Sequence, residues 1–106
     1  MTLALTVGTN TYISLSDAES YVERLYLPDG LWAAATDATK NTLLAQATLM
    51  IDREVWRYAK TDPDQALEFP RNGNEDIETK VTYACVEQAL HLLRSGDSSA
   101  KRRDLQ

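Results

Sequence analysis

The middle of the chain decides how its helices are arranged. Residues 56–73 read Trp56-Arg57-Tyr58-Ala59-Lys60-Thr61-Asp62-Pro63-Asp64-Gln65-Ala66-Leu67-Glu68-Phe69-Pro70-Arg71-Asn72-Gly73. Pro63 and Pro70 lack a backbone donor and push the preceding residue out of the α region, so this stretch cannot be one continuous helix. Four of its side chains are too large for an ordinary flexible linker: Trp56, Tyr58, Leu67 and Phe69. We predict an ordered connector, pinned by these side chains, between two helical halves. The alternative is an irregular loop that covers the end of a helical core.

A capping box predicts the first helix. Ser16 covers a free amide of the first turn and Glu19 reaches back to the start of the helix. The residues that follow place one apolar face at spacings i, i+3, i+4 and i+7, formed by Ala18, Tyr21, Val22 and Leu25. Pro28 and Gly30 end this helix because both residues break helices.

Two shorter segments flank the first helix. Residues 9–15 alternate loosely and fit a short strand or extended arm, with Tyr12 and Ile13 or Leu15 packing inward. Residues 31–35 form a brief apolar segment that fits a helical turn, with Trp32 as its anchor.

The strongest helical pattern precedes the connector. Thr36 or Asp37 caps it, and we predict a helix from about Asp37 to about Val55 that forms the spine of the core. Its apolar residues recur at helical spacing: Leu43, Leu44, Ala47, Met50, Ile51 and Val55. The opposite, polar face is predicted to hold Lys40, Asn41, Gln46 and Arg53.

Another helix follows the connector. Asn72-Gly73-Asn74 predicts a turn, and a helix begins near Glu75 or Asp76, because acidic residues suit the positive end of a helix dipole. Gly96 is the predicted residue just past its end. The predicted apolar stripe comprises Ile77, Val81, Ala84, Cys85, Gln88 and Leu92, widened by Ala89 and Leu93.

These elements predict one mainly α domain, a small bundle of three to four helices. With 106 residues, 43% of them hydrophobic, the chain is long enough for one core. We divide it into an extended arm (1–15), a helical core (16–95) and a flexible basic C-terminal tail (96–106) that contains Lys101-Arg102-Arg103. No apolar run approaches the roughly 20 residues of a membrane helix, and the N-terminus lacks the features of a signal peptide.

The residue inventory argues against catalysis. Cys85 and His91 point roughly opposite ways around the last predicted helix, so they form neither a catalytic dyad nor a zinc site. The four glycines are isolated, so there is no phosphate-binding loop. Asp62 and Asp64 fit turn formation better than calcium binding. We therefore expect a protein that is not an enzyme and uses no cofactor or metal.

Charge and aromatic residues give conflicting indications about nucleic acid. The net charge of −5 argues against a general nucleic-acid binder. Trp56 and Tyr58, beside three cations, fit a stacking site for single-stranded nucleic acid. They fit better a connector packed on the spine helix with arginine stems over the rings, and a subunit interface comes second. The three cations are Arg57, Lys60 and Arg71.

Several motifs resemble a known family. They comprise Thr11-Tyr12-Ile13-Ser14-Leu15-Ser16-Asp17-Ala18, Trp32-Ala33-Ala34, Leu44-Ala45-Gln46-Ala47-Thr48, Trp56-Arg57, Gln65-Ala66-Leu67-Glu68-Phe69-Pro70-Arg71 and the stripe from Ile77 to Leu90. Over roughly Thr11 to Leu93, the chain resembles small phage and prophage proteins known as DnaT-like single-stranded-DNA-binding proteins. It is similar as well to the helical head-tail connector (adaptor or head-completion) proteins of tailed phages. Tyr58 and Glu78 depart from the family pattern, which has glycine and proline there.

The connector resemblance implies a structural virion protein in the phage neck. It implies a ring of about twelve copies that binds the portal protein and the tail, stopper or terminator proteins, assembled in the host cytoplasm, with DNA passing through an acidic lumen without specific binding. The implied portal contacts are Ala100, Lys101, Arg102, Arg103, Asp104, Leu105 and Gln106. The candidates for subunit or tail contacts are Trp56, Arg57, Tyr58, Phe69, Pro70 and Arg71.

We expect the connector role from the sequence, with two alternatives. One is a DnaT-like protein that binds single-stranded DNA, and the other is a small helical interaction module. Acidic residues along one face of a ring would favour the connector. A cluster of cations around an exposed Trp56 would favour DNA binding: Arg53, Arg57, Lys60 and Arg71.

Overall fold

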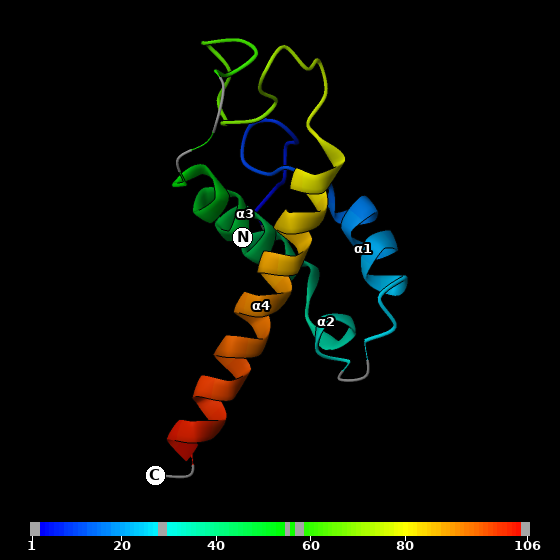
Figure 1. The fold of residues 1–106 in the computed structure, drawn as a ribbon. Coiled ribbons are helices and arrows are strands. Elements are labelled where there is room, and N and C mark those ends of the chain that lie inside the picture. Colours follow the sequence, from blue (N-terminus) through cyan, green and yellow to red (C-terminus); the bar gives the residue numbers. More distant parts are fainter. Residues whose placement is uncertain (1–2, 28–29, 55, 57–58, 105–106) are drawn as a thin grey trace.

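Helices dominate the computed structural model (Figure 1). The structure describes residues 3–27, 30–54, 56 and 59–104, with the backbone alone for 96–104. In chain order the helices are α1 (Leu15–Glu23), α2 (Leu31–Ala34), α3 (Asp37–Asp52) and α4 (Thr79–Asp104). No strand occurs in this described part. The predicted mainly α bundle of three to four helices is confirmed.

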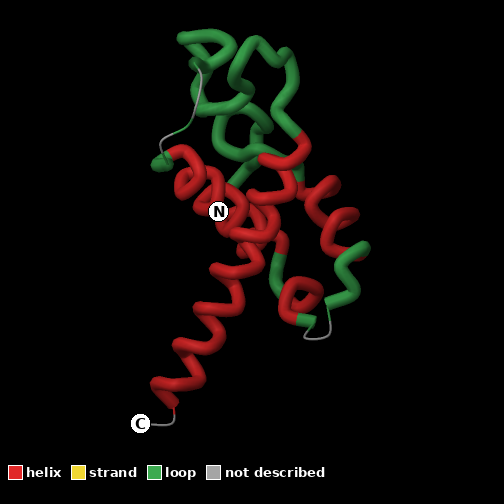
Figure 2. The backbone as a smooth tube through the Cα atoms, viewed as in Figure 1, coloured by secondary structure: helices red, strands yellow, loops and turns green. Residues whose placement is uncertain are grey.

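Helix α4 is the axis of the fold. The largest interhelical contact joins α3 to α4, and α1 and α2 both pack on α4 as well. The N-terminal loop and the connector lie together at the end where α4 begins (Figure 2). The last turns of α4 extend away from the other helices (Figure 1), which gives a molecule 49 Å long and 28 Å across.

The first helix begins two residues earlier than the capping box predicts. Ser14, not Ser16, is the cap, and its Oγ accepts a hydrogen bond from Asp17 N at 3.1 Å. Glu19 does not reach back to the helix start; its carboxylate binds Trp32 and Lys40 instead. The predicted apolar face is confirmed, because Ala18 is buried and Tyr21, Val22 and Leu25 pack against the core.

Helix α3 has the predicted cap and a shorter end. Thr36 Oγ1 accepts a hydrogen bond from Thr39 N at 3.2 Å, and the helix stops at Asp52, while Val55 lies outside the described residues. The prediction that Lys40 lies on a polar face is wrong, because Lys40 is only 6% exposed. Its ammonium lies 2.7 Å from Glu19 Oε1 and 5.4 Å from the centre of the Trp32 ring, so its charge has partners in the core.

Helix α4 differs from its prediction at both ends. It begins at Thr79 rather than near Glu75, and it continues through Gly96 to Asp104 instead of ending at the glycine. Its buried stripe includes Val86 and Leu90, which the sequence pattern omits, while Ala84 is exposed. Three helices pack against α4, so it buries a wider face than one amphipathic stripe.

The loops at the start of α4 are ordered by side chains. Tyr12 and Ile13 are buried as predicted, and Tyr12 N donates to Thr48 Oγ1 at 3.2 Å. In the connector, Gln65 Nε2 donates to the carbonyls of Leu67 and Pro70 at 2.8 and 2.9 Å. Leu67 and Phe69 are buried, so the prediction of an ordered connector is confirmed.

Candidate functional site

A hollow of about 560 Å³ lies where the connector meets α3 and α4. We call it the aromatic pocket. The end of α3 and the connector form one wall, and the first turns of α4 form the other. Its lining residues are Ile51, Trp56, Phe69, Arg71, Asn72, Asn74, Glu78, Lys80, Val81 and Ala84.

Two aromatic rings shape this pocket. Trp56 and Phe69 meet edge to face, with ring centres 5.0 Å apart and an angle of 72°. Phe69 is buried and meets Tyr12 in the same manner at 5.8 Å. Trp56 is 37% exposed, and its Nε1 donates to the Ile51 carbonyl at 2.8 Å. The contact with Phe69 and the hydrogen bond to Ile51 therefore fix the orientation of the partly exposed Trp56 ring.

Hydrogen bonds from the core hold the pocket floor in place. The Tyr12 hydroxyl donates to Asp52 Oδ1 at the end of α3 and accepts from Phe69 N at 3.2 Å. Asp52 Oδ1 accepts a second bond from Glu68 N at 3.4 Å. Burial raises the pKa of the Tyr12 hydroxyl, and the hydrogen bond to Asp52 and the charge of Asp52 raise it further. Tyr12 therefore stays protonated and keeps donating.

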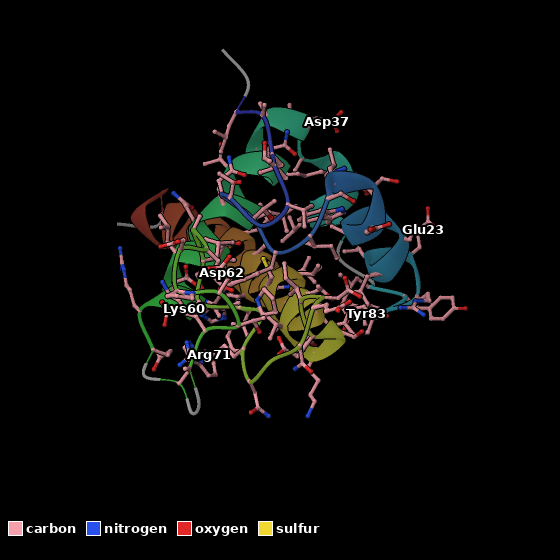
Figure 3. The ribbon with its side chains drawn as sticks, turned by 90° about the horizontal axis from the view of Figure 1, so that it is seen from above. Glu23, Asp37, Lys60, Asp62, Arg71 and Tyr83 are labelled. Carbon is pink, nitrogen blue, oxygen red and sulfur yellow. The ribbon has the colours of Figure 1, made fainter. Side chains whose placement is uncertain are left out.

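One carboxylate joins two of the predicted cations. Arg71 is buried, and its Nη1 donates to Glu68 Oε1 at 3.0 Å, while Lys60 Nζ lies 3.4 Å from Glu68 Oε2. Arg71 Nη2 also donates to the Trp56 carbonyl at 3.4 Å. Figure 3 shows Lys60 and Arg71 on the same side of the molecule. These three side chains together carry one net positive charge, which the Glu78 carboxylate near Arg71 offsets.

The rim on the α4 side carries its own polar groups. Glu78 Oε1 accepts from Asn74 Nδ2 at 2.7 Å and from Arg71 N at 3.3 Å. Burial alone would raise the pKa of Glu78, but these hydrogen bonds and the nearby Arg71 charge outweigh it and lower the pKa. Lys80 is exposed on the same rim, and a cation there can reach a ligand in the pocket.

The structure brings part of the predicted interface set together. Trp56, Phe69 and Arg71 line the aromatic pocket, whereas Pro70 lines a different groove. Arg57 and Tyr58 lie outside the described residues. The predicted portal contacts Ala100 to Asp104 belong to the far end of α4, and Leu105 and Gln106 lie outside the described residues. Whether any of these residues contacts a partner stays a prediction.

Sequence reasoning missed the α4 side of the pocket. Lys80, Val81 and Ala84 face the connector, while Asn74 and Glu78 lie in the turn before α4. The i and i+4 spacing of Lys80 and Ala84 places them on one helix face. It does not reveal that the connector lies opposite.

Chemistry-bearing residues elsewhere do not reach this pocket. The Cys85 thiol is buried against Thr48 and the Leu44 carbonyl, at 3.4 and 3.5 Å, and burial raises its pKa. His91 is exposed further along α4. Among the described residues, no cluster of histidine, cysteine or carboxylate side chains could hold a metal ion. None of the described helices combines the length and hydrophobicity that crossing a membrane requires.

Comparison with known proteins adds one match. A family model described as "Putative DnaT-like ssDNA binding protein" matches residues 2–105. No curated protein and no solved structure matches the chain.

The match overturns the expected function. The interpretation as a head-tail connector of the virion is wrong, because the family model that matches carries the DnaT-like ssDNA-binding description instead. The resemblance stated from the sequence was correct for the DnaT-like family alone. The portal partner and the virion location expected with the connector stay untested.

The family model spans nearly the whole of the 106 residues, from the N-terminal loop through α4. The aromatic pocket and all the elements that form it lie inside this span. The chain therefore belongs to the family of DnaT-like single-stranded-DNA-binding proteins.

Proposed function

We propose that this protein binds single-stranded DNA and that the aromatic pocket takes an unpaired base against Trp56. The observation that supports the site is a partly exposed indole held by Phe69 and by the Ile51 carbonyl. Every base has a flat π face, so stacking on an aromatic side chain accepts any sequence and contributes about 1–3 kcal/mol per base. The proposed activity is binding without chemical turnover.

The charges near the pocket suit a strand that passes along its rim. Lys80 stands exposed on the α4 side. Together with Lys60 and Arg71 it outweighs the carboxylates of Glu68 and Glu78, so one net positive charge remains around the pocket. The net charge of −5 nevertheless repels phosphates over the rest of the surface. Affinity must therefore depend more on stacking than on neutralising phosphates, which favours single strands over duplexes.

Fluorescence anisotropy with a labelled oligo(dT) tests this proposal. We expect saturable binding at about 50 mM salt, about tenfold weaker binding by Trp56→Ala, and recovery of much of the affinity in Trp56→Phe, which keeps a stacking face. Tyr26→Ala is the matched control, because Tyr26 is an aromatic side chain 89% exposed and absent from the pocket. Absence of binding at low salt, or equal affinity for Trp56→Ala and the native chain, would refute the proposal.

A further inference from the structure

A second hollow, of about 810 Å³, lies between α1, the start of α4 and the connector. We call it the tyrosine groove. Tyr21 of α1 and Tyr83 of α4 stack across it, with ring centres 4.2 Å apart and an angle of 10°. Arg24 Nη2 donates to the Tyr83 hydroxyl at 2.9 Å, and the guanidinium lies within 5.7 Å of both ring centres. The tyrosines therefore engage a cation already, and Arg24 is held beside them.

The remaining charge in the groove is negative. Three exposed carboxylates line it, and none forms a salt bridge to a cation among the described residues: Asp17, Glu75 and Asp76. Among the residues that line the groove, Arg24 is the only cation, against these three carboxylates. An aromatic surface beside excess negative charge is suited to cationic side chains, which interact with both.

The chain carries a cationic segment of its own. Lys101, Arg102 and Arg103 are consecutive and hold three of the eleven basic residues, while the protein as a whole carries a net charge of −5. Their backbone belongs to the final turns of α4, which extend away from the other helices (Figure 1). The fold thus separates a cationic end from an acidic groove at opposite ends of one helix.

A continuous α4 cannot place its own end in its own groove. Thr79, Thr82 and Tyr83 at the start of α4 line the groove. At about 1.5 Å per residue, Lys101 lies about 27 Å further along the axis than Tyr83. The basic end of another copy has no such restriction.

We propose that two copies associate head to tail, with Lys101-Arg102-Arg103 of one copy docked in the tyrosine groove of the next. The positive charge of this segment is opposite in sign to the carboxylates of Asp17, Glu75 and Asp76 that line the groove. Such a contact joins two different surfaces, so each copy keeps one free end and association can continue. It does not depend on the proposed DNA binding, because the aromatic pocket is a separate hollow.

Sedimentation velocity of the full chain without DNA tests this contact. We expect association that increases with protein concentration at about 50 mM salt and weakens at about 500 mM, because the contact is ionic. The paired change Glu75→Lys and Asp76→Lys should raise the apparent dissociation constant at least tenfold. A control with the same charge change outside the groove, Glu54→Lys and Asp64→Lys, should associate like the native chain.

Charge exchange makes the test specific. The reversed tail Lys101→Glu, Arg102→Glu and Arg103→Glu should also abolish association, and combining it with the reversed groove should restore association. A native chain that stays monomeric at low salt would overturn the proposal. Equal association of the reversed-groove variant and the native chain would overturn it too.

Discussion

The Tyr12 hydroxyl donates a hydrogen bond to the Asp52 carboxylate, which joins the N-terminal loop to the last residue of α3. The same hydroxyl accepts from Phe69 N, and the same carboxylate accepts from Glu68 N. Three segments that are distant in sequence therefore meet at one pair of side chains. Because Phe69 packs against Trp56, this pair positions the aromatic pocket.

Tyr12→Phe should destabilise the protein and loosen the connector. The phenylalanine ring keeps the packing but leaves Asp52 Oδ1 and Phe69 N without the hydroxyl, so we expect a loss of about 1–3 kcal/mol in the free energy of unfolding. Urea denaturation measures the loss, and hydrogen exchange should show faster exchange at Glu68 and Phe69. Tyr26→Phe is the control because Tyr26 is 89% exposed. Unchanged exchange at both amides would contradict the positioning role.

Raising the pH into the alkaline range should lower the free energy of unfolding, and Tyr12 should cause part of this fall. Burial and Asp52 raise the pKa of Tyr12 above its ordinary value of 10.0. Above that value the unfolded chain loses this proton while the folded chain keeps it, so stability falls as the pH rises, by up to about 1.4 kcal/mol per pH unit. Urea denaturation between pH 9 and 11 should show a shallower fall for Tyr12→Phe. Identical slopes for the two proteins would contradict this account.

The sequence predictions are accurate where the interacting residues are close in the sequence, and they fail where distant residues decide the structure. Thr36, one of the two predicted caps of α3, is the cap in the structure, and its partner Thr39 N is only three residues away. The capping pattern before α1 occurs twice, as Ser14 with Asp17 and as Ser16 with Glu19. Only the tertiary partners of Glu19, which are Trp32 and Lys40, decide between the two, and periodicity does not reveal them.

The pocket was predictable in part for the same reason. Trp56 and Phe69 stand out in the connector sequence, so their joint role could be anticipated. Lys80 lies on a helix whose exposed face carries other polar residues, and nothing local distinguishes it. Its place on the pocket rim depends on how the connector turns back over the start of α4.

Lys80→Gln should reduce the salt dependence of DNA binding. If Lys80 neutralises one phosphate, removing it lowers the slope of log K against log salt by about 0.7 for a single strand. Lys60→Gln is a comparison on the connector side, where Lys60 pairs with Glu68 at 3.4 Å. Arg53→Gln is the matched control, because Arg53 is exposed and lines a different hollow. Anisotropy titrations at several salt concentrations give the slopes. If only Lys60→Gln lowered the slope, the phosphate contact would lie on the connector side, and the role given to Lys80 would be wrong.

Glu19→Gln should destabilise the protein at neutral pH but not in acid. Burial opposes ionisation of Glu19, yet the bonds from Lys40 and Trp32 lower its pKa below the ordinary value of 4.5. A lowered pKa means that the stabilisation is present above about pH 4.5 and is lost as the pH falls through the folded pKa. Urea denaturation between pH 7 and 3 should show the two proteins converging. Glu23→Gln, on the same helix and exposed, should match the native chain at every pH.

Lys40→Met distinguishes the contribution of the Lys40–Glu19 ion pair to stability from that of the packing of the Lys40 stem. The Lys40 stem lies in the core beside Trp32, and its ammonium contacts Glu19. Removing one member of a buried ion pair leaves the other charge without its partner. Lys40→Met leaves the Glu19 carboxylate, whose side chain is 37% exposed to water, whereas Glu19→Gln leaves the Lys40 ammonium, whose side chain is only 8% exposed. We expect Lys40→Met to be less destabilising than Glu19→Gln at pH 7. The reverse order in urea denaturation would show that the pair itself holds α1 to α3.

Cys85 should react with thiol reagents only when the protein opens. Its side chain is fully buried, and burial raises its pKa, so both access and the thiolate fraction are low in the folded state. At pH 8 we expect Ellman's reagent to modify the native protein far more slowly than the urea-unfolded chain, at a rate that follows the population of open molecules. Tyr12→Phe should speed this reaction, because the loss of the hydroxyl's bonds to Asp52 and Phe69 destabilises the fold and raises the population of open molecules. A native rate close to that of the unfolded chain would place the thiol at the surface and contradict the packing of α3 on α4.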